Sequence, residues 1–263
     1  MAGHSKWANI KHVKARQAIK RGKIFTKLIR AISMATRLGG EDVDSNPRLR
    51  AMVDKAYAAN MTKDMIHRAI KRVTGGEASS DNLAEVRYEG YGPNGVAVMV
   101  DCLTDNKNRT VAEVRHAFRE CGGNLGTDGS VSYLFTQRGL LTFPPNSDEE
   151  KIIEMALEMG ADDITTNNDG SINVITVPEK LEKVRDAMKS ADLNFSYAEV
   201  TILASTEIKL DKENVERMLR LRETLENLDD VQNVYSNAEP VKRYNNNYSD
   251  DEPSCIGNLY QLE

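Results

Sequence analysis

The chain has 263 residues, of which 40% are hydrophobic, 29% charged and 6% aromatic, and its formal net charge is −5. This composition is typical of a soluble globular protein with two or three domains, and it excludes a disordered chain. No run of about 18 or more apolar residues is present, which excludes a membrane-spanning helix.

The charge is distributed unevenly along the chain. Residues 1–37 contain ten Lys or Arg and no Asp or Glu. Residues 1–75 hold 17 basic and 5 acidic residues, whereas residues 76–263 hold 18 basic and 35 acidic residues. An asymmetry of this kind indicates that one end of the molecule binds a polyanion.

The segment before Gly22 differs from the helices that follow it. Its basic residues point all round a helical wheel and its apolar residues form no compact stripe, so a helix here has little to pack against. We expect a mobile arm that orders on an anionic surface, with Lys and Arg neutralising phosphates and Trp7 stacking on a base. The expected nucleic-acid contacts in the arm and the next helix are Lys6, Trp7, Lys11, Lys14, Arg16, Lys20, Arg21, Lys23, Lys27 and Arg30.

Three helices are predicted up to residue 75, and together they form a small bundle. Over 24–38 the apolar residues share one face of the helix and the basic residues share the other. Asn46-Pro47 starts a second helix that ends near Asn60, and Thr62 caps a third that Gly75-Gly76 closes. The expected core positions are Phe25, Leu28, Ile29, Ile32, Ala35, Thr36, Leu49, Met52, Val53, Ala56, Met65, Ile66, Ala69, Ile70 and Val73.

After Gly76 the pattern alternates between strands and helices. Strands are expected over 84–88, 96–103, 131–135, 140–143, 171–177, 196–203 and 231–235, with a short extended piece at 208–210. Helices are expected over 110–121, 148–159, 179–190 and 213–228, the first with Thr110 and Glu113 as a capping box. The predicted fold class is therefore multi-domain α+β, with an N-terminal helical bundle followed by two ferredoxin-like α+β sandwich domains.

Two further segments are candidates for ligand contact. Asp105–Thr110 leads into a helix N-terminus, where free N–H groups favour anions, so Lys107 and Arg109 are expected to contact phosphate; simple capping is the alternative. The glycine-rich loop over 122–130 runs from helix to strand, the reverse of a dinucleotide loop. We interpret it as a shaped loop or a contact surface made by Gly122, Gly123, Asn124, Gly126, Thr127, Asp128 and Gly129.

The sequence contains no recognisable catalytic or metal-binding motif. The four histidines have no metal-ligand spacing, and neither a Walker loop nor a GxSxG elbow is present. The cysteines Cys102, Cys121 and Cys255 form no CxxC pair, which indicates a reducing, cytoplasmic environment. We therefore expect no catalytic residues, no metal, no cofactor and no small-molecule substrate.

Seven segments together resemble the YebC family: residues 2–12, 20–27, 46–50, 88–93, 103–110, 122–130 and 229–235. The resemblance covers about residues 1–238. The family's N-terminal motif begins at residue 2, so we expect no transit peptide before it. The resemblance implies a helical domain followed by two α+β domains, with the third domain inserted into the second. The implied domains are 1–75, 76–137 with 204–238, and 138–203. The polar tail, 239–263, is expected to be disordered.

The resemblance leaves two functions open. Some members of the family are described as probable transcriptional regulators that bind DNA, and others are similar to translation factors that help the ribosome through difficult sequences such as proline runs. The basic residues here lack the compact layout of a helix-turn-helix, whereas an all-round basic arm suits a deep phosphate-lined cleft. We therefore expect a monomeric regulator that binds ribosomal RNA, with promoter DNA as the alternative and no membrane contact.

Overall fold

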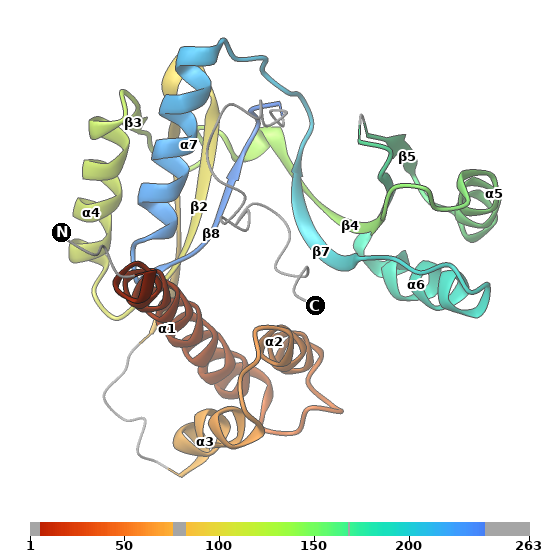
Figure 1. Cartoon of the computed structure of the whole chain (residues 1–263), viewed down its shortest axis with the longest axis horizontal. Coiled ribbons are helices and arrows are strands. Elements are labelled where there is room, and N and C mark those ends of the chain that lie inside the picture. Colours follow the sequence, from red (N-terminus) through yellow and green to blue (C-terminus); the bar gives the residue numbers. More distant parts are fainter. Residues whose placement is uncertain (1–5, 76–82, 168, 240–263) are drawn as a thin grey trace. The chain divides into compact units, whose positions relative to one another are not determined.

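The computed structural model describes the backbone of residues 6–75, 83–167 and 169–239, and side chains from residue 21 onward within those ranges (Figure 1). These residues form two compact units. Unit 1 comprises the chain up to Ser130 together with Leu210–Val234, and unit 2 comprises Val131–Lys209 with the described residues after Val234. None of the described helices is both long enough and apolar enough to cross a bilayer.

Unit 1 begins with three helices, α1 (Lys6–Gly39), α2 (Pro47–Ala58) and α3 (Lys63–Thr74). Their shared core contains Ile32 and Ala35 from α1, and the expected apolar positions of α2 and α3 other than Val73 pack around them. Thr62 caps α3 by accepting a hydrogen bond from the Met65 N–H. The predicted bundle of three amphipathic helices is confirmed.

Asn46 connects the end of α1 to the start of α2. Its side-chain oxygen accepts a hydrogen bond from the Leu49 N–H at 3.0 Å, which caps α2. Its amide nitrogen donates to the carbonyls of Ala35 and Gly40, each at 2.9 Å. A Cβ on Gly39 would lie 2.6 Å from that nitrogen, so only glycine permits this close approach.

The remainder of unit 1 is a sheet with strand order β3-β1-β2-β8. The strands are β1 (Ala84–Tyr91), β2 (Ala97–Thr104), β3 (Asn124–Leu125) and β8 (Val231–Ser236), and the single turn η1 (Pro93–Gly95) joins β1 to β2. Helices α4 (Lys107–Glu120) and α7 (Lys212–Glu226) contact each other, and they bury Val114 and Phe118 on α4 and Met218 and Leu221 on α7.

Unit 2 is a second sheet, with strand order β5-β6-β4-β7. Its elements run β4 (Phe135–Phe143), α5 (Glu149–Met159), β5 (Asp163–Thr166), β6 (Ile172–Thr176), α6 (Leu181–Ser190) and β7 (Tyr197–Ala204). The single turns η2 (Ser132–Leu134) and η3 (Pro178–Lys180) precede β4 and α6. This βαββαβ order is ferredoxin-like, and the predicted α+β fold class is confirmed.

Several predicted element boundaries were wrong, each for a physical reason. Helix α4 begins one turn before Thr110, because Asn106 caps it by accepting from the Arg109 N–H. The strand expected over 131–135 was wrong, because Ser132–Leu134 form the turn η2. The strand expected over 140–143 begins earlier, at Phe135, because it continues through Gly139, which pairs with both Thr176 and Val200. A Cβ on Gly139 would lie 2.4 Å from the Thr176 hydroxyl. Strand β5 was not predicted, and 208–210 contributes only a bridge from Ile208 to Ala238.

The division into three domains at 1–75, 76–137 with 204–238, and 138–203 stays a prediction. The structure groups the three N-terminal helices with the first sheet in unit 1. The sheet of unit 2 lies in sequence between β3 and β8 of the first sheet. Residues 240–263, which contain most of the tail expected to be disordered, lie outside the described residues.

Candidate nucleic-acid interface

The expected basic arm and the helix after it form one continuous helix. Helix α1 starts at Lys6 and passes through Gly22 without a break. The side chains of Lys6, Trp7, Lys11, Lys14, Arg16 and Lys20 lie outside the described residues, as do residues 1–5 entirely. Their contacts with nucleic acid, and the mobility of the arm, stay predictions. Arg21 is the first expected contact whose side chain is described, and it is exposed.

The basic face of α1 beyond Gly22 is turned toward the C-terminal end of α7. The Lys23 amino group donates to the Asn227 carbonyl at 3.0 Å, and the Lys27 amino group donates to the Glu226 carbonyl at 2.6 Å. Arg30 donates to the Asp229 carbonyl at 3.2 Å. The last carbonyls of a helix lack intrahelical partners and carry the negative end of its dipole. Lys23 and Lys27 therefore cap α7, and Arg30 binds the backbone just after it.

Asp230 is the centre of this α1–α7 contact, and its side chain is only 2% exposed. Arg30 donates to Oδ1 at 2.7 Å, and Arg109 donates to Oδ2 at 2.7 Å. The hydroxyls of Thr104 and Thr110 lie 3.0 and 2.8 Å from Oδ2. The carboxylate thereby links α1, β2 and α4, and the backbone of Asp230 accepts from the Leu103 N–H at 2.8 Å.

The ionisation of these groups follows from their surroundings. Burial by itself raises the pKa of Asp230, but hydrogen bonds from Arg109, Thr110, Arg30 and Thr104 together bring the pKa below its usual value. Desolvation lowers the pKa of Lys27, against the attraction of Glu226 and Asp229. Burial, followed by the nearby charges of Asp230 and Asp101, raises the pKa of the Cys102 thiol to about 12. Cys102 is therefore an unreactive thiol.

The two cations expected near the N-terminus of α4 have different roles. Arg109 pairs with Asp105 and Asp230, both at 2.7 Å. Lys107 is exposed, and within the described part of the chain its amino group has no hydrogen bond or ion pair. Lys107 therefore remains accessible to a phosphate, whereas Arg109 is held by internal partners.

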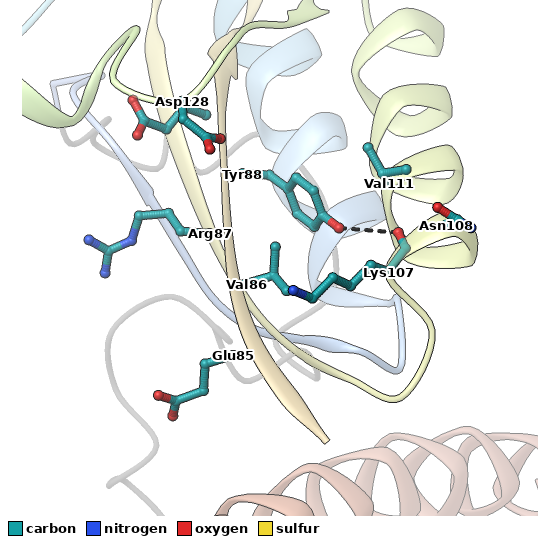
Figure 2. Close-up of a pocket in the computed structure, with 9 residues that line it drawn as sticks. Glu85, Val86, Arg87, Tyr88, Lys107, Asn108, Val111 and Asp128 are labelled. Atoms are coloured by element: carbon teal, nitrogen blue, oxygen red, sulfur yellow. Dashed lines mark hydrogen bonds between the residues drawn. The ribbon is translucent and has the colours of Figure 1, made fainter. Parts of the chain in front are cut away.

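A hollow of about 480 Å³ lies between β1 and the start of α4 (Figure 2). The Tyr88 hydroxyl points toward α4 and donates to the Lys107 carbonyl at 3.3 Å, while Arg87 and Glu85 point away from the helix. Asp128, which belongs to the glycine-rich loop, lines one end of the hollow. The lining carries charges of both signs, and it gives no preference for an anionic or a cationic ligand.

The glycine-rich loop packs against β1. A Cβ on Gly123 would lie 2.4 Å from the Tyr91 carbonyl, and a Cβ on Gly126 would lie 2.5 Å from the Ser130 hydroxyl. The buried Glu89 accepts from the Gly129 N–H at 3.0 Å, and Gly129 has a φ of +81°. These contacts explain why the loop contains glycine. The contact-surface role of Gly122, Gly123, Asn124, Gly126, Thr127, Asp128 and Gly129 stays a prediction.

Sequence reasoning missed two features of this region. Asp230 was noted only as part of a motif, because its burial depends on α1, β2 and α4, which are remote in sequence. The exposed basic residues of α3 were also missed, although the four-residue spacing of Lys63, His67 and Lys71 is visible in the sequence. Among the described residues, no cluster of three or more His, Cys, Asp or Glu side chains has a geometry that holds a metal ion.

The fold and the charge distribution together define an α+β protein with a basic helical N-terminal region and an acidic remainder. Residues 5–76 match the family model described as the TACO1/YebC protein N-terminal domain, and residues 83–238 match the model described as the TACO1/YebC second and third domain. The chain therefore belongs to the TACO1/YebC family.

Similar proteins include a probable transcriptional regulatory protein of Coxiella burnetii, 77% identical over 239 residues, which cover 91% of this chain and 98% of that protein. A probable transcriptional regulatory protein of Methylococcus capsulatus is 62% identical over 239 residues, covering 91% and 96%. A crystal structure of a conserved hypothetical protein from Aquifex aeolicus has a TM-score of 0.74 and 43% identity, covering 86% of this chain and 94% of that one.

Proposed function

We propose that the protein is a non-enzymatic regulator of gene expression that binds nucleic acid through its N-terminal helical region. The observation that carries this proposal is the charge of that region: ten basic residues and no acidic residue in the first 37 positions, in a chain that is acidic elsewhere. Most sequence-independent affinity for nucleic acid comes from Lys and Arg that neutralise phosphates and release counterions.

We propose ribosomal RNA on the ribosome as the partner, in the role of a translation factor that assists elongation through difficult sequences such as proline runs. An unusually long basic helix, 34 residues in α1, supports this choice because it can reach into a phosphate-lined cleft. The second candidate is regulation of transcription through promoter DNA. The names of the relatives from Coxiella burnetii and Methylococcus capsulatus favour that candidate.

The contacts proposed for this function are the cations of α1 up to Arg21, with Lys107 as a separate contact. Lys23, Lys27 and Arg30 were predicted to bind phosphates, but in the structure they donate to the end of α7 and to Asp230. A phosphate that recruits them has to replace those hydrogen bonds. A phosphate that binds Arg109 likewise has to replace its hydrogen bonds to Asp105 and Asp230.

The test is ultraviolet crosslinking in growing cells, followed by sequencing of the bound nucleic acid. The variant changes Lys14, Arg16 and Lys20 to Gln. The matched control changes Lys183, Lys212 and Arg220 to Gln, because these three exposed cations lie outside the N-terminal helical region. We expect crosslinks concentrated in ribosomal RNA for the natural protein and the control, and their loss in the variant. Crosslinks at promoters with ribosomal RNA at background would instead favour the transcriptional role.

A further inference from the structure

Helix α3 separates apolar from basic residues more completely than its neighbours. Ile66, Ala69 and Ile70 are buried in the bundle. Lys63, His67 and Lys71 follow one another at four-residue spacing on the exposed side, with Arg68 beside them. Residues four apart in a helix lie on the same face, about 6 Å apart along the axis. The exposed face of α3 is therefore a row of basic side chains.

The charges in this row are available to a ligand. Within the part of the chain that the structure describes, the side chains of Lys63, His67 and Lys71 make no hydrogen bond or ion pair. Arg68 donates from Nε only to the Asp64 carbonyl of its own helix. Asp64 is the one acidic residue of α3. The row thus keeps its positive charge exposed to solvent, unlike Lys23, Lys27 and Arg30 of α1.

The composition of the row identifies its partner as a polyanion. A helix that binds a membrane surface needs an exposed apolar face, but the apolar residues of α3 are already buried in the core. A protein interface is centred on aromatic or aliphatic anchors, and the exposed row over 63–72 contains none. Evenly spaced cations without an apolar centre are suited to the repeated phosphates of a nucleic-acid backbone.

We propose that the exposed face of α3, formed by Lys63, His67, Arg68 and Lys71, binds phosphates of the RNA backbone. This contact is additional to the α1 arm, and it rests on the proposed function in taking RNA as the polyanion. Binding at this face requires no change in the hydrogen bonds that Lys23, Lys27 and Arg30 make to residues 226–230.

The test compares two full-length variants with the natural protein. Lys63→Gln with Lys71→Gln removes two charges from α3, and Gln retains a similar helix propensity. Lys183→Gln with Lys212→Gln removes the same charge from exposed helix positions elsewhere. Filter binding to a ribosomal RNA fragment and to a DNA duplex is measured over a range of KCl concentrations, and the melting temperature of each protein is recorded as a check of folding.

We expect the α3 variant to bind the RNA more weakly and to lose about 1.4 from the slope of log affinity against log salt, for two single-strand phosphate contacts. The control should retain the slope of the natural protein. If the natural protein binds RNA and the α3 variant binds equally well, the α3 inference is wrong and the proposed function stands. If the loss is confined to DNA, the assignment to RNA is wrong. If the natural protein binds neither probe, the proposed function itself fails.

Discussion

Helices α1 and α3 carry similar basic stripes but place them in different surroundings. Both helices bury an apolar face in the same core, and both repeat basic residues at four-residue spacing: Lys23 and Lys27 in α1, and Lys63, His67 and Lys71 in α3. The amino groups of Lys23 and Lys27 donate to the C-terminal carbonyls of α7, whereas those of Lys63 and Lys71 have no partner among the described residues.

The difference shows that a stripe of Lys and Arg has no fixed function of its own. A cation next to unsatisfied carbonyls and a buried carboxylate stabilises the fold. The same cation facing water contributes little to stability and is available for an external anion. The comparison therefore predicts that substitutions in α1 after Gly22 change the free energy of unfolding, and that substitutions in α3 change binding.

The largest effect is expected for Asp230→Ala. This change removes a buried carboxylate that accepts hydrogen bonds from Arg30, Arg109 and the hydroxyls of Thr104 and Thr110. The two arginines then keep the Asp229 carbonyl and the exposed Asp105 as acceptors. We expect the free energy of unfolding to fall by about 3 kcal/mol, because both arginines retain partial access to water. Urea denaturation measures the loss. Asp229→Ala is the control, since Asp229 is exposed, and it should change stability by less than about 0.5 kcal/mol.

The contribution of Asp230 should also depend on pH. Its pKa is lowered in the folded protein, so its stabilisation is complete above the unfolded pKa of about 3.9 and is lost as the pH falls through the folded pKa. We expect the difference in stability between the natural protein and Asp230→Asn to shrink below about pH 4. Urea denaturation at several pH values provides the measurement. A difference that stayed constant down to pH 2 would contradict this assignment.

A smaller effect is expected for Lys27→Ala. The Lys27 amino group is half-buried and donates to the Glu226 carbonyl at 2.6 Å. Its loss should lower the free energy of unfolding by about 1 kcal/mol. Lys71→Ala makes the same substitution on α3 and should change stability by less than about 0.5 kcal/mol. Equal losses in the two variants would remove the distinction between the two helices.

Much of the fold follows from local patterns in the sequence. The apolar face of α1, the Asn46-Pro47 start of α2 and the Thr62 cap of α3 were all predictable, because each depends on neighbours within one or two turns. The start of α4 was predicted wrongly because two local signals compete. Asn106 caps the helix, whereas Thr110, the predicted cap, donates its hydroxyl hydrogen to Asp230.

Strand boundaries were harder to predict because they depend on distant partners. The continuity of β4 through Gly139 is set by β6 on one side and β7 on the other. Strand β5 has four residues, Asp163–Thr166, and only one of them is large and apolar. Its pairing with β6, through Ile164 opposite Val174, gives it a strand geometry that its own sequence does not signal.

The sequence alone determined that this protein is α+β with a basic helical N-terminus, because helix periodicity, caps and charge are local properties of the chain. Only the tertiary structure decided which cations are available. Lys23 and Lys27 donate to the end of α7, and Arg30 donates to Asp230, across about 200 residues of sequence. Arg109 donates to Asp230 across 121 residues. A contact over such a separation depends on how the chain folds back on itself, and no pattern within α1 or α4 encodes it.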